Sequence, residues 1–430
     1  MKNQNSLENL VIVVRADPII CGHSTEARNL AEAALAQGVN KVDIVTYPLD
    51  LLKESGLPLK PEDSILPYSE GITVHRPEEI GDYKVLDGRT LHGMSGKVID
   101  ILEESEGTTA IMDLYLVPHA KVVNDAASTF RLSHPGADIL TIAEAVGSDV
   151  TNVVENAVQE GNLGAAELVL ASYLKHDVLL AVSEYTKEVI VEAAKEFDKE
   201  RGTSFAPQLE ERIQISYPAV DSSAYLDIEN RPDEVRQALT GRELEKDRYV
   251  LFLSRVTDAK GVDDLIDGYQ MSGLAGKLPL VIAGSGPAQP DMVARAAGDP
   301  NVIFFTDIPD NEKGILMHGS GSYVFPTRPR PEFVETFGIA LAEKMLAGGS
   351  GPVITTRTGG VPEAVGDNCL YVETDNPDNV AQVLNQAHSM PIEHRLSLAS
   401  AAREYALQFD RANVFGNILN IAGYPQAHER

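Results

Sequence analysis

Residues 249–261 read Tyr249-Val-Leu-Phe-Leu-Ser-Arg-Val-Thr-Asp-Ala-Lys-Gly261, an apolar run followed by a polar loop. The run predicts a buried strand, and the sequence after the loop predicts a helix that begins near Val262. Ligands of open parallel sheets bind beyond the carboxyl ends of the strands, so Arg255 and Lys260 lie where a ligand is expected. A guanidinium and an ammonium together neutralise a diphosphate, and we interpret the loop as a diphosphate clamp. A solvated loop in which Lys260 has no role is the alternative.

Short β-branched runs alternate with helical stretches on both sides of this segment. The predicted strands are Leu10–Val14, Val42–Thr46, Thr109–Met112, Ile139–Ile142, Val178–Val182, Tyr249–Leu253, Leu278–Ile282, Val302–Phe305, Tyr323–Phe325 and Pro352–Thr355. A helix is predicted between the first two, from Ser24 to Gln37, because apolar residues recur there at helical spacing. This alternation predicts an α/β fold with parallel sheets and crossover helices.

One stretch, Glu200–Asp233, interrupts the alternation with charged residues and three prolines. We therefore place a domain boundary near Asp221, which gives an N-terminal domain of residues 1–220 and a second domain of residues 221–410. Two doubly wound domains of this kind are expected to face each other across a cleft.

The composition restricts the partners of the chain. Among 430 residues, 64 are acidic and 36 basic, and residues 1–225 alone contain 36 acidic and 18 basic residues. This charge disfavours nucleic acid and anionic lipid as partners. The N-terminus does not resemble a signal peptide, no apolar run is long enough to span a membrane, and Cys21 and Cys369 are too few for a disulfide framework. We expect a cytoplasmic protein without stable membrane association, and the sequence does not indicate its oligomeric state.

A second candidate segment runs from Pro326 through a proline-rich loop into a helix that contains Glu343. Seven residues separate Glu335 from Glu343, so both carboxylates can lie on one side of the helix entrance. The backbone N–H groups of Phe337, Gly338 and Ile339 would then be available to phosphate or sugar oxygens. The alternative is an ordinary helix whose acidic residues complement its dipole.

Four motifs in this order resemble the donor-binding domain of the family-four retaining glycosyltransferases. They are Ser254-Arg255 with Lys260-Gly261, Ile282-Ala-Gly-Ser-Gly-Pro287, Glu335-Thr-Phe-Gly338 with Glu343, and Thr358-Gly-Gly-Val-Pro-Glu363. The resemblance covers about residues 178–410 and is faint before them. It implies the GT-B architecture, which consists of two Rossmann-like domains, and it implies that the last segment, residues 411–430, forms a helix that packs back on the N-terminal domain.

The resemblance also implies roles for individual residues. Arg255 and Lys260 would bind the donor diphosphate and stabilise its charge during bond cleavage, Glu335 would lie beside the transferred sugar, and Glu343 would bind the ribose hydroxyls. The backbone of Phe337, Gly338, Ile339 and Ala340 would contact sugar and phosphate. No metal and no separate cofactor is implied, because the nucleotide diphosphate sugar, by family frequency a UDP-sugar, is a co-substrate. We interpret Asp263-Asp264 and Glu103-Glu104 as solvated faces, not as ligand sets.

The N-terminal domain departs from the family pattern in two places. The family has a glycine pair after the first strand, and here Gly22 is present while His23 takes the other position; His23 is either an acceptor contact or a neighbour of the helix cap. The family's usual histidine after a later strand is absent. His119, Asp113 or Glu144 is a candidate to fill its space, with an ordinary loop histidine as the alternative.

The sequence therefore predicts a retaining, metal-independent glycosyltransferase that moves a hexose from a nucleotide sugar to a hydroxyl of a small soluble acceptor. A UDP-sugar 2-epimerase or a phosphorylase-like enzyme is the main alternative, since both use two Rossmann-like domains around a phosphate site. A sugar-binding protein without catalytic activity is a third hypothesis, although it would not need the cations Arg255 and Lys260.

Overall fold

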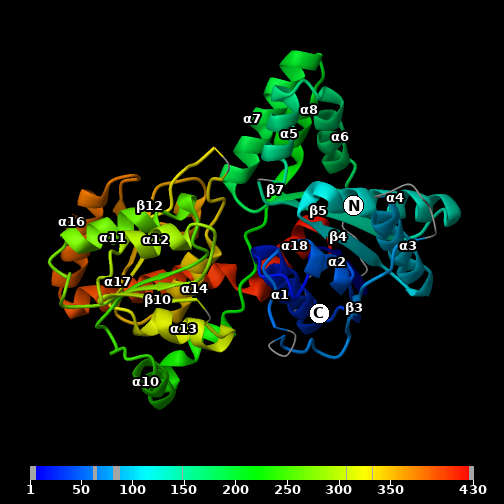
Figure 1. Ribbon diagram of the computed structural model, residues 1–430. Coiled ribbons are helices and arrows are strands. Elements are labelled where there is room, and N and C mark those ends of the chain that lie inside the picture. Colours follow the sequence, from blue (N-terminus) through cyan, green and yellow to red (C-terminus); the bar gives the residue numbers. More distant parts are fainter. Residues whose placement is uncertain are drawn as a thin grey trace. The chain divides into compact units, whose positions relative to one another are not determined.

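The computed structural model describes residues 6–61, 65–80, 88–147, 149–306, 308–331 and 333–425. The chain divides into two compact units (Figure 1). The N-terminal unit contains Met1–Ala219 together with Arg411–Arg430, and the C-terminal unit contains Val220–Asp410. The chain thus passes from the first unit to the second after Ala219 and returns after Asp410.

The N-terminal unit is built on a parallel sheet of seven described strands in the order β3-β2-β1-β4-β5-β6-β7. Their bounds are β1 Asn9–Val13, β2 Lys41–Val45, β3 Ile72–His75, β4 Thr109–Leu114, β5 Ile139–Ala145, β6 Val178–Ala181 and β7 Ile213–Ile215. The sequence predicted five of these strands within a few residues of their ends. It missed β3 and β7, the short strands at the two edges, where partial burial makes the apolar pattern weak.

Strand β1 shows why this sheet is covered on both faces. Its side chains alternate between two clusters of buried residues: Leu10 and Ile12 belong to one, and Val11 and Val13 belong to the other. Because both faces are buried, the strand is apolar at nearly every position and shows no polar alternation.

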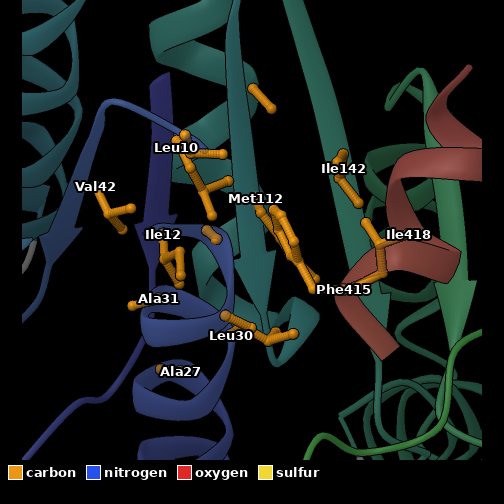
Figure 2. Packing of buried hydrophobic residues seen from close by; sticks show 14 of the residues in the cluster. Leu10, Ile12, Ala27, Leu30, Ala31, Val42, Met112, Ile142, Phe415 and Ile418 are labelled. Carbon is orange, nitrogen blue, oxygen red and sulfur yellow. The ribbon is translucent and has the colours of Figure 1, made fainter. Parts of the chain in front are cut away.

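On the first face, Leu10 and Ile12 lie beside residues of α1 (Gly22–Ala36), including Leu30 (Figure 2). Helix α18 (Arg411–Ala422) adds Phe415 and Ile418 to the same cluster. Val414 and Leu419 of the same helix are buried in this cluster as well, so the last helix packs on the N-terminal unit.

The other helices of this unit cover the second face and the β5–β7 side of the sheet (Figure 1). They are α3 Gly88–Glu104, α4 Leu116–Ser133, α5 Thr151–Gln159, α6 Leu163–Leu174, α7 Glu184–Arg201 and α8 Phe205–Arg212, while the short helix α2 Leu49–Glu54 follows β2. Helices α3 and α4 pack on each other over β1 and β4, whereas α5 to α8 enclose a separate buried cluster with β5, β6 and β7.

The C-terminal unit repeats the architecture with six described strands, all parallel, in the order β10-β9-β8-β11-β12-β13. The strands are β8 Val250–Leu253, β9 Leu280–Ala283, β10 Val302–Phe305, β11 Ser322–Phe325, β12 Val353–Thr356 and β13 Leu370–Val372. The helices are α9 Ser223–Leu226, η2 Ile228–Asn230, α10 Pro232–Gly241, η3 Asp258–Lys260, α11 Val262–Met271, α12 Gln289–Arg295, α13 Asp310–Gly319, α14 Ile339–Ala347, α15 Val361–Val365, α16 Pro377–Ser389, α17 Ile392–Ala406 and η4 Leu407–Phe409. Both units are therefore Rossmann-like, as the sequence predicted.

Candidate functional site

Each sheet reverses its strand order beside its first strand. In the N-terminal unit β1 lies between β2 and β4, and in the C-terminal unit β8 lies between β9 and β11. The loops that leave two such neighbouring strands diverge to opposite sides, which opens a crevice at the carboxyl ends where ligands of this fold class bind. The predicted site residues follow these strands, so we describe the two crevices in turn.

In the C-terminal unit, Lys260 and Glu335 form a buried ion pair. Lys260 follows β8, Glu335 follows β11, and their side chains hydrogen bond to each other although 75 positions separate them. The Lys260 ammonium also lies 4.8 Å from the ring centroids of both Phe325 and Phe333. Lys260 is 5% exposed and Glu335 8% exposed, so in this structure the cation is neutralised by the carboxylate and enclosed by aromatic rings.

Gly261 allows the β8 loop to approach the β11 loop closely. Its φ of +66° lies in the left-handed region, and a Cβ atom at this position would overlap the carbonyl oxygen of Pro326. The hydroxyl of Thr327 donates to the carbonyl of Ala259 at 2.8 Å and joins the same two loops. The position of Lys260 is therefore fixed by backbone contacts as well as by its ion pair.

Arg328 holds the proline-rich loop in place. Its side chain is 4% exposed and binds Asp258, Asp263, Asp264 and Asp375 at 2.5 to 3.2 Å. This network corrects the interpretation of Asp263-Asp264 as a solvated face: Asp264 is 8% exposed, and the guanidinium of Arg328 occupies both carboxylates. The sequence gave no sign of these partners, because they lie far from Arg328 along the chain: three belong to η3 and the first turn of α11, and Asp375 precedes α16.

Gly338 caps the N-terminus of α14 with a φ of +99°. The first N–H groups of the helix, at Ile339 and Ala340, have no acceptors within the helix, and both residues are only partly buried. The ring of Phe337, in contrast, is 2% exposed and packs edge-on against Phe409 at 4.9 Å. This anchors the entrance of the helix, so that only backbone groups are offered to a ligand.

Glu343 lies one turn into α14 and is hydrogen bonded to the hydroxyl of Tyr225. Burial raises the pKa of the Glu343 carboxyl, while the Tyr225 hydrogen bond opposes this shift. Burial raises the pKa of Tyr323 in β11 well above its usual value, and the carboxylates of Glu343 and Glu335 add to this shift. That both carboxylates lie on one side of the helix entrance, beside one ligand, stays a prediction.

Arg255 differs from Lys260. It is exposed, and among the described residues no ion pair or hydrogen bond of its side chain is recorded. The two cations of the predicted clamp therefore differ in this structure: Arg255 is exposed, whereas Lys260 is neutralised by Glu335.

In the N-terminal unit, Gly22 and His23 begin α1. Gly22 is exposed, and the ring of His23 lies 4.9 Å from the ring of Tyr115. Asp113, His119 and Glu144 are fully buried. Of the four acceptor-side candidates, His23 is thus the one with a partly exposed side chain.

Asp113 is paired with a residue that the sequence analysis did not single out. The Nε2 atom of His176 lies 2.7 Å from the Asp113 carboxylate, and both side chains are fully buried. The Nδ1 atom of His176 faces the carbonyls of Ser172 and Tyr173 at 3.0 and 3.3 Å. Burial lowers the pKa of His176, but Asp113 and the two carbonyls outweigh this effect and leave the pKa raised.

His119 has a different environment. Its Nδ1 atom lies 2.9 Å from the carbonyls of Leu114 and Tyr115, which identifies this nitrogen as the protonated one. The Nε2 atom then accepts from the hydroxyl of Tyr47 at 3.3 Å. Burial lowers the pKa of His119, so the ring is neutral at physiological pH.

Glu144 belongs to a group of buried carboxyls with Glu26 and Asp149. Within the described residues, neither oxygen of Glu144 has a hydrogen-bond partner. Burial raises its pKa well above the usual value, and the charges of Glu26, Asp113 and Asp149 add to this shift. Burial likewise raises the pKa of Glu26 to about 7 and that of Asp149 to about 6. These carboxyls hold protons at pH values where exposed ones are ionised.

Three further residues lie at this crevice that the sequence had not indicated: Arg15, Tyr47 and Tyr115. Each lies one or two positions beyond the end of β1, β2 or β4. The guanidinium of Arg15 lies 4.6 Å from the ring centroid of Tyr115. The rule that identified Arg255, a cation just after an apolar run, also applies to Arg15 and would have found it.

Two further findings concern other parts of the structure. Among the described residues, no group of three or more His, Cys, Asp or Glu side chains is arranged to hold a metal ion, and no helix has the length and apolar character needed to cross a membrane. A cavity of about 350 Å³ lies beside α10, lined by Val235, Leu239, Lys246 and His318 among others. Lys246 and His318 precede β8 and β11, so this cavity is at the amino ends of the strands, away from the crevice.

Comparison with known proteins supports the sequence resemblance. Residues 238–405 match the family described as glycosyl transferases group 1. The D-rhamnosyltransferase WbpZ of Pseudomonas aeruginosa is 34% identical over 137 residues, which are 31% of this chain and 34% of that protein. The O-antigen chain mannosyltransferase C of Escherichia coli is 35% identical over 104 residues, 24% of this chain and 26% of that protein. The chain thus matches about a third of the length of these curated relatives or less.

Solved structures extend the similarity in fold to nearly the whole chain. HepE of Anabaena, solved in complex with UDP and glucose, has a TM-score of 0.65 at 14% identity and covers 96% of this chain and 99% of its own. A glycosyltransferase from Rickettsia africae has a TM-score of 0.67 at 15% identity, with 97% and 98% covered.

The chain has the GT-B fold, two Rossmann-like domains, over nearly its whole length. Within it, residues 238–405 form the part that matches the group 1 family model. The resemblance to GT-B glycosyltransferases that the motifs indicated is thereby confirmed.

Proposed function

We propose that this protein is a retaining glycosyltransferase that transfers a hexose from a nucleoside diphosphate sugar to a hydroxyl of a small soluble acceptor. One observation supports this most directly. Lys260, Glu335 and the N-terminus of α14 all lie at the reversal point of the sheet, inside the segment that matches the glycosyltransferase family model. A cation, a carboxylate and unpaired backbone N–H groups suit a diphosphate joined to a sugar.

Arg255, Lys260 and the first N–H groups of α14 would bind the diphosphate. In transfer, the bond between the sugar and the diphosphate breaks, and negative charge grows on the departing phosphate oxygen. Preorganised cations stabilise that charge more in the transition state than in the ground state. Because Lys260 is paired with Glu335 in this structure, we expect the bound diphosphate to compete for the Lys260 ammonium and leave Glu335 beside the sugar.

Retention of configuration would follow if the acceptor hydroxyl attacks on the face from which the diphosphate departs. The departing phosphate can then take the acceptor proton, so no side-chain base is needed. Glu343 would bind the ribose hydroxyls from its position in α14. Since the two cations supply the positive charge, we propose that the reaction is metal-independent, and full activity after treatment with a chelator is the expected result.

Several nucleotide sugars are candidates for the donor. The solved structure of HepE contains UDP and glucose, while the two curated relatives are named as a rhamnosyltransferase and a mannosyltransferase. We propose a UDP-sugar first and GDP-mannose second. The acidic surface of the chain supports a soluble acceptor, because anionic lipid surfaces repel it.

Thermal stabilisation by UDP, GDP and ADP, and by their sugars, tests the proposal with and without magnesium. A nucleotide at about 100 times its Kd stabilises the folded state by about 2.7 kcal/mol, which is readily detected as a rise in Tm. We expect one nucleotide to stabilise the protein without metal, and Arg255→Ala to weaken its binding while the exposed Arg201→Ala does not. If no nucleotide raises the Tm, the glycosyltransferase hypothesis fails. If a UDP-sugar binds but yields an epimerised sugar, the 2-epimerase hypothesis replaces it.

A further inference from the structure

Arg15 is a half-buried cation that forms no ion pair with any described residue. It follows β1 in a unit whose first 225 residues contain twice as many acidic as basic residues. Other partly buried arginines of this unit have acceptors: Arg28 binds Asp17 at 2.9 Å, and Arg212 donates to the carbonyls of Leu174 and His176. For Arg15, no ion pair or hydrogen bond is recorded within the described residues.

The nearest carboxylate in sequence, Asp17, is occupied by other groups. It accepts from Arg28 and from the hydroxyls of Ser24 and Tyr68, and the ammonium of Lys60 lies 3.5 Å away. Removing a guanidinium from water without a counter-ion costs free energy, so its exposed edge is suited to an anion from outside.

The surroundings of Arg15 fix its orientation. The guanidinium lies over the ring of Tyr115, whose backbone φ of +74° is unusual for so bulky a residue. Such backbone strain persists where the surrounding structure holds a side chain in a required position. The Tyr115 ring contacts the rings of His23 and His119, at 4.9 and 6.4 Å. The side chain of Arg15 is thus supported on one face.

The same cluster provides an acceptor of hydrogen bonds beside the cation. Because the Tyr47 hydroxyl donates its proton to Nε2 of His119, its oxygen retains lone pairs for a substrate hydroxyl. Arg15 and Tyr47 each follow by two positions the paired residues Val13 and Val45 of the neighbouring strands β1 and β2. Burial raises the pKa of Tyr47 to about 12, and the charge of Arg15 acts against this shift. A small molecule that carries both an anionic group and a hydroxyl would bind Arg15 through the first and Tyr47 through the second.

We propose that the acceptor of the transfer reaction carries an anionic group and that Arg15, supported by Tyr115, binds that group. This inference rests on the proposed glycosyltransferase function and specifies its acceptor. A guanidinium recognises phosphate and carboxylate by the same two-pronged geometry. A free sugar phosphate, a sugar acid and a lipid-linked phosphate share this chemistry, and the test distinguishes them.

The test measures binding of paired neutral and anionic compounds to the full-length protein saturated with the nucleotide found by thermal stabilisation. The pairs are glucose with glucose 6-phosphate, mannose with mannose 6-phosphate, glycerol with glycerol 3-phosphate, and glucose with glucuronate. Phosphatidylcholine vesicles with and without polyprenyl phosphate form the lipid arm. We expect one anionic member to bind at least tenfold more tightly than its neutral partner, and the arm in which it appears identifies the source of the anion.

The variant Arg15→Met should abolish that preference and leave the nucleotide Kd within twofold of the wild type, whereas Arg201→Met, a charge-matched control on the exposed end of α7, should keep it. Arg15→Lys retains the charge and should retain part of the preference for the anionic compound. If Arg15→Met does not fold, the anion preference of Arg15→Lys is compared with that of the wild type instead. The absence of any anionic preference across the panel overturns the proposal, as does an Arg15 variant that weakens nucleotide binding as much as anion binding. Failure of nucleotide binding itself would instead reject the underlying glycosyltransferase function.

Discussion

The C-terminal crevice and the N-terminal crevice differ in how some of their buried charges are compensated. In the C-terminal unit, Lys260 is neutralised by Glu335, and Arg328 by four aspartates. In the N-terminal unit, Glu144 is buried without a hydrogen bond from the described residues, and Arg15 has an aromatic ring but no recorded carboxylate. Ion pairs hold the loops that carry them in one conformation. A buried carboxyl without a partner avoids the cost of a buried charge by remaining protonated. The first crevice is held by ion pairs, and we expect the charge of the second to change with pH, because burial raises the pKa values of Glu26 and Glu144.

The largest effect is expected from breaking the Lys260–Glu335 pair. Lys260→Met leaves the Glu335 carboxylate buried without its cation, which should lower the free energy of unfolding by about 3 to 5 kcal/mol. The double variant Lys260→Met with Glu335→Gln should recover most of this loss, because no lone charge remains. Urea unfolding of the three proteins measures both values. Equal stability of the single variant and the wild type would mean that the pair contributes nothing to the fold.

Removal of Arg328 should have the next largest effect. Arg328→Met leaves the partly buried Asp263 and Asp264 close together without their shared cation, and we expect a loss of about 3 kcal/mol. Arg330 offers a control in the same loop, because it binds Asp258 and Asp375 but is more exposed, at 23% against 4%. Arg330→Met should cost about 1 kcal/mol or less. Similar losses for both variants would contradict the role of burial.

The N-terminal unit should lose stability as pH rises. The pKa of Glu26 is about 7 in the folded protein against a usual value of 4.5, so the native state holds this proton more tightly than the unfolded chain. The free energy of unfolding should therefore fall between about pH 4.5 and pH 7. Glu26→Gln removes the titration and should stabilise the protein by about 2 kcal/mol at pH 8, with little effect at pH 4. Thermal unfolding of both proteins at the two pH values checks this sign, which would be reversed if Glu26 were ionised in the native state.

The smallest effect concerns Glu343. Glu343→Gln keeps a hydrogen-bond acceptor for Tyr225 but removes the charge, so the fold should be unchanged. Loss of a charged acceptor for the ribose hydroxyls should weaken nucleotide binding about tenfold, or 1.4 kcal/mol. Isothermal titration with the preferred nucleoside diphosphate, beside the corresponding base and phosphate alone, measures this difference. An unchanged Kd would remove Glu343 from the ribose site.

The sequence indicated much of the fold because its signals are local. Apolar runs such as Val302–Phe305 are strands in the structure with the predicted bounds, and the helix predicted from Ser24 to Gln37 is α1, Gly22–Ala36. The loop cations and the two glutamates could be found for the same reason: each lies in the loop or helix that directly follows an apolar run. The edge strand β13, whose residues Leu370 and Tyr371 are only partly buried, gave no comparable signal.

The partners of these residues were decided by the tertiary structure. The sequence placed Lys260 in a ligand loop and Glu335 near a helix, but only the parallel neighbours β8 and β11 bring them into contact across 75 positions. In the same way, Arg15 meets Tyr115 because β1 and β4 are neighbours in the sheet, and Asp113 of β4 meets His176, which lies between α6 and β6. Hydrophobic periodicity and turn signals depend on a few neighbouring residues, so they can be recognised in the sequence. Ion pairing, burial and the resulting pKa values depend on which strands are neighbours. The order of the strands is set only when the sheet forms.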